Sequence, residues 1–485
     1  MNERQIRQLK PMLSAYLKRF DDCFVRKGTR AHLQVYVEGQ LSNLERKSVE
    51  PIAKAAGMAP RTLQEFLSLL KWDEDGARDR LQSIVATEHA SPHAVGIVDE
   101  TSFAKQGKKT PGVQRQWCNC RGKTDNCIVT VHLGYAADAF HCLLDGELYL
   151  PESWASDRER CREAAIPETM TYRPKWQIAL ELYDRARSHG IVFAWLTFDE
   201  GYGSKPGFLR GLHAREQPFV GEVPRSFTGW IKPPRVTDRP FRRHRRGRGR
   251  KTPRIVSGSP PARSVEYLLN RAPQLRRQPW KPYRVRDGEQ GPMVWEAKHA
   301  MFYLADEQRL PDPRPWHLLI ARNVLNPKEV KYFVGDAPQK TPVGTLLLAG
   351  FSRWPVERCF EDQKSELGMD HYEGRRYPGL KRHLILTAIS YLFLSRVRKV
   401  QGEKRRGTDR HPDPYGDRGP GPLLVAEAAG AGKTHRTHRE EHPRHAGRQC
   451  QSPQSSHQGH EAETPGSRHQ ADENRALHMG HELAL

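Results

Sequence analysis

The chain has 485 residues and a net charge of +22, and its 37% hydrophobic residues exclude a wholly disordered chain and allow about two or three domains with cores. No run reaches the ~18 apolar residues of a membrane span, no apolar signal region opens the chain, and eight unevenly spaced cysteines do not indicate a disulfide scaffold. Together these three features fit a reducing cytoplasm. The 79 Lys and Arg against 57 Asp and Glu favour a polyanionic partner, although a merely soluble basic protein is the alternative.

Residues 1–90 are predicted to form a helical, DNA-binding domain. Apolar residues recur there at helical spacing, at Leu33, Val37, Leu41 and Leu44. Two further helical stretches, 48–56 and 60–70, are joined by a short segment that begins with Gly57. Helix, glycine turn and helix is the outline of a helix-turn-helix, and a plain helical hairpin fits the pattern equally well.

Residues 91–220 have the pattern of an α/β domain, because the hydrophobic period becomes strand-like near residue 93. Strands are expected at 94–99, 127–135, 140–150 and 191–198, and helices at 174–188 and from about 204. Residues 105–121 are rich in Lys, Gly and Gln and are predicted to be a loop. Three strands, a helix, a strand and a helix follow one another in a ribonuclease H-like mixed sheet, which is the fold class that we expect.

Residues 221–345 are predicted to be a β-rich insertion in this core. Short strand-like segments replace the helical rhythm, at 283–286, 293–295, 316–321 and 330–334. The insertion contains the densest positive run of the chain, whose charges would repel one another if buried. We therefore expect a surface loop that binds DNA through Arg242, Arg243, Arg245, Arg246, Arg248, Arg250 and Lys251.

Helical pattern returns in residues 346–400, which are assigned to the second part of the core, with helices at 354–367 and 380–397. Residues 401–485 differ in composition, since they contain no Ile, Phe or Trp and ten of the 22 histidines. Such a segment cannot bury a core, and we expect a disordered tail. The abrupt change also resembles translation in a shifted reading frame, a hypothesis that resequencing the DNA around codon 400 would test.

Two of the predicted strands end in an aspartate, Asp99 and Asp199. The carboxyl end of a strand lies at the rim of the sheet, where α/β proteins place their sites. In the ribonuclease H order the first and fourth strands are neighbours, so the two aspartates would repel each other unless a cation lies between them. Each aspartate taken alone also fits a strand-ending or helix-capping residue.

A third acid, Glu357, follows Pro355 in the first turn of a helix, where the helix dipole favours the ionised form. Lys364 lies seven residues later, on nearly the same face. A solvated pair on an exposed face is the alternative, and Glu361 and Glu366 compete for the role of third acid. Three such carboxylates can hold two Mg²⁺ ions, for which Mn²⁺ can substitute, and the ions can activate a water or a 3′-hydroxyl.

The segment Arg353-x3-Glu357-x6-Lys364 matches the R, E and K of the Y-x2-R-x3-E-x6-K signature of DDE transposases with a β-rich insertion. The tyrosine of that signature would fall on Gly350, so its role is vacant. The chain resembles bacterial insertion-sequence transposases and is similar to the insertion-sequence 701 family. The segments that carry this resemblance are 96–105, 112–116, 149–154 and 199–203.

The resemblance covers roughly residues 15–400 and implies an enzyme that cleaves DNA strands with metal ions and transfers them to a target. It implies that Asp99, Asp199 and Glu357 bind the metals and that Arg353 and Lys364 contact DNA. The implied partner is the double-stranded DNA of transposon ends and target, bound by a homodimer at the bacterial nucleoid. Two alternatives stay open: a nuclease of the same architecture without strand transfer, and a DNA-binding protein derived from an inactive transposase.

Three cysteines and two histidines are of the residue types that bind zinc: Cys118, Cys120, Cys127, His132 and His141. Their spacing does not follow the usual C-x2-4-C pattern. Alternation along the strand also turns Cys127 and His132 to opposite faces. The sequence therefore does not predict zinc here.

Overall fold

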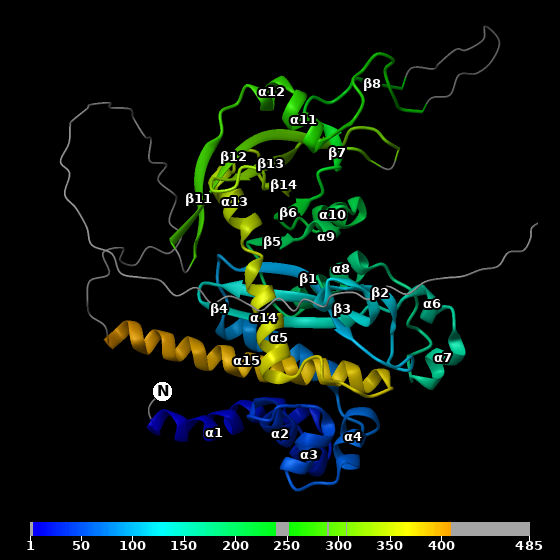
Figure 1. Cartoon of the computed structure of the whole chain (residues 1–485), viewed down its shortest axis with the longest axis vertical. Coiled ribbons are helices and arrows are strands. Elements are labelled where there is room, and N and C mark those ends of the chain that lie inside the picture. Colours follow the sequence, from blue (N-terminus) through cyan, green and yellow to red (C-terminus); the bar gives the residue numbers. More distant parts are fainter. Residues whose placement is uncertain (1–2, 239–251, 289–290, 307, 409–485) are drawn as a thin grey trace, which may run out of the picture. The chain divides into compact units, whose positions relative to one another are not determined.

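The structure is a computed structural model that describes residues 3–238, 252–288, 291–306 and 308–408 (Figure 1). All of them lie in the first of two compact units, Met1–Leu423. The basic run of residues 242–251 and the tail from residue 409 onward lie outside the described residues. In the described part of the chain, no helix is both long enough and apolar enough to cross a membrane.

The amino-terminal region is helical, as predicted. Its helices are α1 (Glu3–Leu17), a 3-10 helix (Lys18–Cys23), α2 (Lys27–Leu41), α3 (Val49–Ala55), α4 (Pro60–Ser68) and α5 (Glu74–Glu88). Gly57 adopts a φ of +65° just after α3, and Pro60 starts α4, so the chain turns sharply between them. Stacked rings of Phe66 and Trp72, 5.5 Å apart, help to fill the core between these helices.

Five strands form the central part of a large mixed sheet, in the order β4-β3-β1-β5-β6. They are β1 (Val95–Ala104), β3 (Lys123–Ala137), β4 (Phe140–Leu148), β5 (Trp195–Phe198) and β6 (Phe219–Val223). The pairs β4–β3 and β3–β1 are antiparallel, whereas β5 is parallel to both β1 and β6. The predicted neighbourhood of the first and fourth core strands, β1 and β5, is confirmed.

Two predictions for this part of the chain are wrong. The first strand does not end at Asp99 but continues to Ala104, because β3 offers backbone partners as far as Cys127. The predicted loop at 105–121 contains a strand, β2 (Gln114–Cys118), which pairs with the start of β3.

The strands of the insertion extend the same sheet, because β14 pairs antiparallel with β6. The order continues from β14 through β13 and β12 to β7 and β10, with β11 beside β12. The strands are β7 (Thr228–Trp230), β10 (Arg263–Ser264), β11 (Lys281–Gly288), β12 (Gly291–Leu304), β13 (Trp316–Asn323) and β14 (Val330–Asp336). β8 (Val236–Thr237) and β9 (Arg254–Ile255) pair antiparallel in a small separate sheet, and α11 (Val265–Arg271) and α12 (Pro273–Arg276) follow β10.

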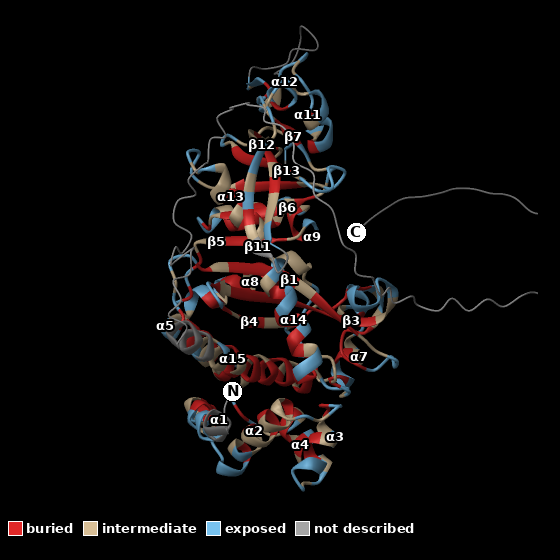
Figure 2. Cartoon of the chain, turned by 60° about the vertical axis from the view of Figure 1, so that its left-hand side comes forward, coloured by how far each residue is buried: buried red, intermediate tan, exposed pale blue. Residues whose placement is uncertain are grey.

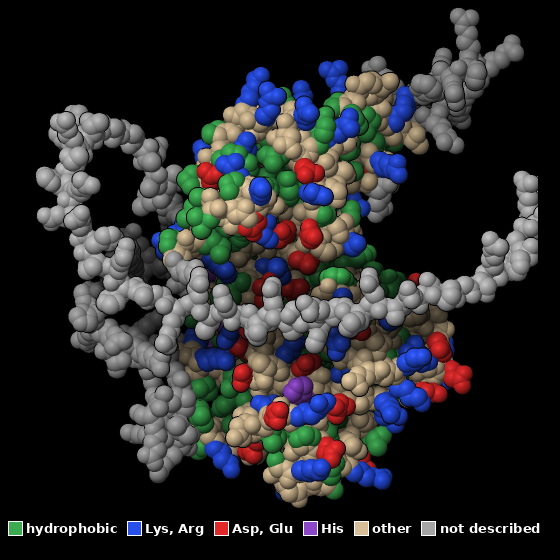
Figure 3. Space-filling view, viewed as in Figure 1, with side chains coloured by type: hydrophobic (Ala, Val, Ile, Leu, Met, Phe, Trp, Pro, Cys, Tyr) green, Lys and Arg blue, Asp and Glu red, His purple; other side chains and the backbone are tan. Residues whose placement is uncertain are grey.

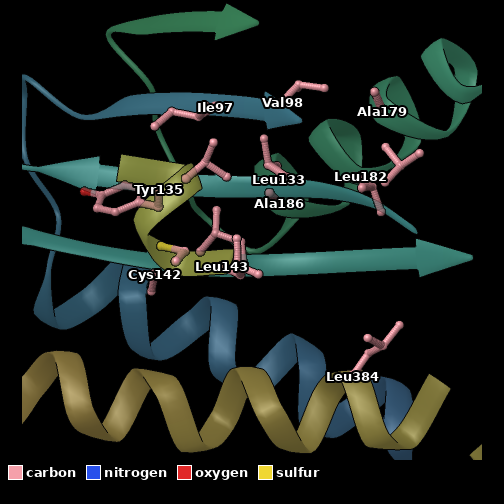
Figure 4. Close-up of a cluster of buried hydrophobic side chains, with 14 of the residues drawn as sticks. Ile97, Val98, Leu133, Tyr135, Cys142, Leu143, Ala179, Leu182, Ala186 and Leu384 are labelled. Atoms are coloured by element: carbon pink, nitrogen blue, oxygen red, sulfur yellow. The ribbon is translucent and has the colours of Figure 1, made fainter. Parts of the chain in front are cut away.

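Helices cover the sheet and enclose the core. They are α6 (Glu152–Ala155), α7 (Arg158–Glu163), α8 (Lys175–Ser188), α9 (Glu200–Gly203), α10 (Pro206–Ala214), α13 (Val343–Phe351), α14 (Trp354–Leu367) and α15 (Tyr377–Thr408). Buried residues concentrate in the strands and along α15 (Figure 2). Side chains such as Ile97, Leu133 and Leu143 from β1, β3 and β4 share one hydrophobic cluster with Leu182 of α8 and Leu384 of α15 (Figure 4).

The last helix, α15, lies between the sheet and the amino-terminal helices (Figure 1). It contacts β4 and α5 on the side of the sheet, where α5 also contacts β4, and α2 and α4 on the other side. Residues 401–408 continue this helix, so the prediction of a disordered tail from residue 401 is wrong for these eight residues. The predicted domain boundaries otherwise stay predictions.

Candidate active site

Asp99 lies on β1 at the place where the parallel pairing with β5 ends. The last paired residues are Val98 and Phe198, and the next residue on each strand is an aspartate. Asp99 and Asp199 therefore follow neighbouring positions of two adjacent strands. The Asp99 side chain is 10% exposed and accepts a hydrogen bond from the Glu100 backbone N–H at 2.8 Å.

Asp199 follows β5 directly, as predicted, and caps α9. Its carboxylate accepts a hydrogen bond from the backbone N–H of Tyr202 at 3.3 Å. The cap turns the chain away from the sheet within one residue of the strand. Gly203 at the end of α9 packs so closely on β6 that a Cβ there would lie 1.9 Å from the Glu222 carbonyl oxygen.

Helix α14 crosses one face of the sheet, in contact with β1, β3 and β4 (Figure 1). A Cβ on Gly134 of β3 would come within 3.2 Å of Val356, so the helix approaches the strand closely. One turn further, Phe360 packs edge-on against His132, the residue opposite Asp99 on β3. Pro355 occupies the start of α14 and Glu357 its first turn, as predicted.

Arg353, the residue before α14, connects two of the three predicted acids. Its guanidinium donates to the Asp99 carboxylate at 2.7 Å and to the Glu357 carboxylate at 2.6 Å. Glu357 is 57% exposed and Asp99 is almost buried, so the arginine spans from the interior to the surface. The structure thus links Asp99 to Glu357 through Arg353, and Asp199 directly follows the adjacent strand β5.

The electrostatics of the cluster reflect burial and like charge. Burial raises the pKa of Asp99 to about 7, Arg353 opposes this rise and Asp199 adds to it. Burial lowers the pKa of Arg353, but Asp99, Glu357, Asp199 and then Glu222 raise it more, so the net pKa is higher than usual. Four carboxylates therefore act on one guanidinium.

Lys364 is also on α14, but it points to the far end of β1 and not to the acids. Its ammonium donates to the Ser102 carbonyl oxygen at 3.4 Å and lies over the Phe103 ring. Burial lowers its pKa. The competing acids lie elsewhere on the helix: Glu361 is exposed and pairs with Arg358, and Glu366 is exposed as well.

Tyr202 and Glu222 belong to the surroundings of this cluster and were missed by sequence reasoning. The Tyr202 side chain is buried, and its hydroxyl finds no hydrogen-bond partner among the described residues. Burial, then the nearby Glu100, Asp99 and Asp199, raise its pKa well above the usual range. Tyr202 could have been found from its place three residues after Asp199, whereas Glu222 follows no such pattern.

The residues present suit a hard cation, although they are not arranged around one. Among the described residues, no group of three or more His, Cys, Asp or Glu side chains is positioned to hold a metal ion. The donors at the cluster are carboxylate oxygens, which Mg²⁺ prefers. A buried aspartate beside a second aspartate and an unpartnered hydroxyl are the features that a bound cation and its waters would satisfy.

Comparison with known proteins identifies the family. The family model described as DDE superfamily endonuclease matches residues 19–292, a stretch of more than half the chain that includes Asp99 and Asp199. The chain belongs to the DDE superfamily endonucleases. It is also 27% identical over 358 residues to the probable transposase for insertion sequence element IS701 of Microchaete diplosiphon, an alignment that covers 71% of this chain and 76% of that protein. The family resemblance predicted from the sequence is confirmed.

One solved structure that aligns with this family member is the NurA nuclease from Sulfolobus solfataricus. The alignment has a TM-score of 0.26 and 11% sequence identity, and it covers 66% of this chain and 86% of that one. A likeness this remote carries no argument about the site, which therefore depends on the residues and contacts described above.

Proposed function

We propose that the chain is a DDE transposase that cleaves DNA strands and transfers them, with Asp99, Asp199 and Glu357 as its catalytic, metal-binding acids. The proposal includes a ribonuclease H-like core. Its support is the strand order β4-β3-β1-β5-β6, with three antiparallel strands followed by two parallel ones. In this order the two aspartates necessarily fall on neighbouring strands.

The observation that carries the proposal is the double contact of Arg353 with Asp99 and Glu357. Arg353 contacts Glu357 within the first turn of α14 and reaches Asp99 across 254 positions of the chain, beside the end of β5 that Asp199 follows. The long-range contact with Asp99 therefore brings the start of α14, with Glu357 in its first turn, to the buried aspartate. The guanidinium also opposes the burial that raises the pKa of Asp99, and so favours the ionised form of that carboxyl, which is the form that binds cations.

Two Mg²⁺ ions, or Mn²⁺ in their place, would supply the activation of a water or 3′-hydroxyl and the stabilisation of the leaving oxygen. Asp99 and Asp199 would hold them from the sheet and Glu357 from α14. The protein itself fixes the positions of the acids. The pairing of β1 with β5 sets the two aspartates side by side, and the capping of α9 orients Asp199. Arg353, once released from the acids, can contact a phosphate bidentately.

DNA binding is proposed for Arg353, Lys364 and a basic patch on the insertion. This insertion basic patch consists of the exposed residues Arg271, Arg276, Arg277 and Lys281 on α11, α12 and β11. Figure 3 shows Lys and Arg side chains over the part of the surface where Figure 1 places α11 and α12, with acidic side chains nearer the middle. Transposon ends and target DNA, bound by a homodimer, are the proposed partners.

The test is cleavage of DNA that carries the element's ends, with Mg²⁺, by the full chain. Asp99→Asn, Asp199→Asn and Glu357→Gln should each reduce cleavage by about a thousandfold or more while DNA binding survives. Glu361→Gln is the matched control, because Glu361 is an exposed glutamate one turn further along α14. Near-normal cleavage by any of the first three variants would reject the role of that residue.

Pre-cleaved ends separate this function from its two alternatives. A transposase joins a pre-cleaved 3′-end to target DNA in the presence of Mg²⁺. A nuclease of the same architecture cuts but gives no joined product. A DNA-binding protein derived from an inactive transposase gives neither product, although its binding still weakens steeply with salt.

A further inference from the structure

Three cysteines lie together at the end of β1 that is remote from Asp99. The sulfur atoms of Cys118, the last residue of β2, and Cys120, in the 3-10 turn of Asn119–Arg121, are 3.3 Å apart. Cys118 and Cys127 are fully buried in a small cluster with Val129. Cys120 is exposed and is the only cysteine of the described residues that is.

Ser102 of β1 holds this arrangement in place. Its hydroxyl donates to the Cys118 sulfur at 3.6 Å and accepts from the backbone N–H of Cys120 at 3.3 Å. One hydroxyl thus fixes both ends of the turn and keeps the two sulfurs on the same side. Burial raises the pKa of the Cys118 thiol, but hydrogen bonds with Ser102, Cys120 and Cys127 lower it more, so the net pKa is below its usual value.

We propose that Cys118 and Cys120 form an oxidisable dithiol, a modification site at which a hydroperoxide generates a disulfide. Exposed Cys120 meets hydrogen peroxide first: its sulfur takes one oxygen, the O–O bond breaks, and a sulfenic acid and one water form. The Cys118 sulfur then attacks the Cys120 sulfur, the S–O bond breaks and a second water leaves. The two thiols lose two protons and two electrons in total, and one peroxide takes them up to become two waters.

Geometry favours Cys118 over Cys127 as the partner of Cys120. The Cys118 and Cys120 sulfurs need to approach by only about 1.3 Å to reach the ~2.05 Å of a disulfide bond. The Cys127 thiol is directed at the carbonyl oxygens of Gln116 and Trp117, at 3.9 and 3.7 Å. Burial also raises the pKa of Cys127 to about 12, which leaves it a poor nucleophile.

Ser102 connects the dithiol to Lys364, the signature lysine of α14. Lys364 donates to the carbonyl of Ser102, whose hydroxyl contacts both Cys118 and Cys120. A disulfide has no thiol hydrogen and moves the sulfurs, so Ser102 must change its partners. We therefore expect oxidation to alter DNA binding, a consequence that rests on the proposed role of Lys364.

Trypsin provides a direct readout, because it cleaves after Arg115 and Arg121 and releases both cysteines in one peptide, Gln116–Arg121. The full chain is treated with hydrogen peroxide, its free thiols are blocked with N-ethylmaleimide, and it is then digested. The expected peptide carries no maleimide and has lost the mass of two hydrogens, and dithiothreitol restores both thiols. Two maleimide groups on this peptide after treatment would overturn the proposal. So would a cross-link to Cys127 in the peptide of residues 124–158, which fragmentation distinguishes from Cys142 of the same peptide.

Single substitutions give the matched controls. Cys120→Ser, at an exposed position that leaves the core intact, should abolish the lighter peptide, while Cys127→Ser should retain it. Cys118→Ser should leave a sulfenic acid at Cys120 that dimedone labels. Loss of the disulfide in Cys127→Ser, with the fold retained, would contradict the assignment.

The effect on DNA binding is measured separately with a duplex that carries the element's ends. Peroxide should change the Kd of wild type reversibly and leave that of Cys120→Ser unchanged. If the disulfide forms and both proteins keep their Kd, the dithiol is not linked to DNA binding, although the modification site stands. If reduced Lys364→Ala binds like reduced wild type, the DNA contact itself is wrong.

Discussion

A guanidinium that contacts two carboxylates neutralises charge that would otherwise be costly to bury. Arg353 does this for Asp99, which is nearly buried, and for Glu357, which is half-exposed. The cationic side chain therefore lies between two of the acids for which metal binding is proposed. The sequence predicted all three residues, but it assigned Arg353 only to DNA, because a contact across 254 positions depends on how α14 packs on β1.

The raised pKa of Asp99 makes a prediction about stability without metal. Its folded pKa of about 7 exceeds its ordinary value of 3.8, so the folded state holds an extra proton between these pH values. The free energy of unfolding should therefore fall as pH rises from about 4 through 7, by on the order of 3 kcal/mol for this group. Urea unfolding in the presence of a chelator, at a series of pH values, measures it.

Two variants make that measurement specific. Asp99→Asn removes the titrating group, so its stability curve should lose this decline. Asp199→Asn removes one cause of the raised pKa, so the decline should end at a lower pH than in wild type. Curves for wild type and Asp99→Asn that run parallel between pH 4 and 7 would show that Asp99 has an ordinary pKa.

At the scale of elements, the unequal lengths of β1 and β5 determine where the acids lie. β5 ends at Phe198, where Asp199 caps α9, but β1 continues beside β3 to Ala104. Asp99 is thus in the middle of a strand, beyond the end of its neighbour. The apolar run before Asp99 predicted the strand correctly, but nothing in it indicates that a partner such as β3 extends the pairing.

The close contact of α9 with β6 makes a prediction at this scale. In Gly203→Ala the new Cβ would meet the Glu222 carbonyl oxygen at 1.9 Å, which is backbone and cannot rotate away. The helix and its cap Asp199 must move, and we expect about 1–3 kcal/mol lower stability together with weaker Mn²⁺ binding. Urea unfolding and Mn²⁺ titration measure the two effects.

Gly28→Ala is the matched control for that substitution. A Cβ on Gly28 in the first turn of α2 meets no atom within 4 Å, so this variant should be as stable as wild type or slightly more stable. Wild-type stability and Mn²⁺ affinity in Gly203→Ala would show that α9 does not fix the position of Asp199.

At the scale of the whole molecule, the sequence predicted the kinds of element better than their connections. The β-rich character of the insertion and the helical amino-terminal region were both predicted. The single sheet that runs from the core into the insertion was not, because the pairing of β14 with β6 joins segments about 110 residues apart. The burial of α15 on two sides was also missed. Its contact with α2 includes a hydrogen bond of 2.8 Å from Gln40 to Thr387, and polar residues of this kind gave no hydrophobic signal of burial.

The insertion basic patch predicts how DNA binding depends on salt. Arg276→Glu should weaken binding to duplex DNA and reduce the magnitude of the slope of log K against log salt by about one. Arg162→Glu, an equally exposed arginine on α7, makes the same change in net charge and should leave the slope as in wild type. Equal losses in both variants would mean that net charge, and not the patch, governs binding.

The claim that three distant acids share bound cations is tested most directly by crystals of the protein grown with Mn²⁺ and measured at a wavelength where manganese scatters anomalously. We predict anomalous density within coordination distance of the Asp99 and Asp199 carboxylates, with Glu357 turned toward it and the Arg353 guanidinium withdrawn from Asp99. Crystals at saturating Mn²⁺ with no anomalous density at these residues, and with Arg353 still bound to Asp99 and Glu357, would contradict the account.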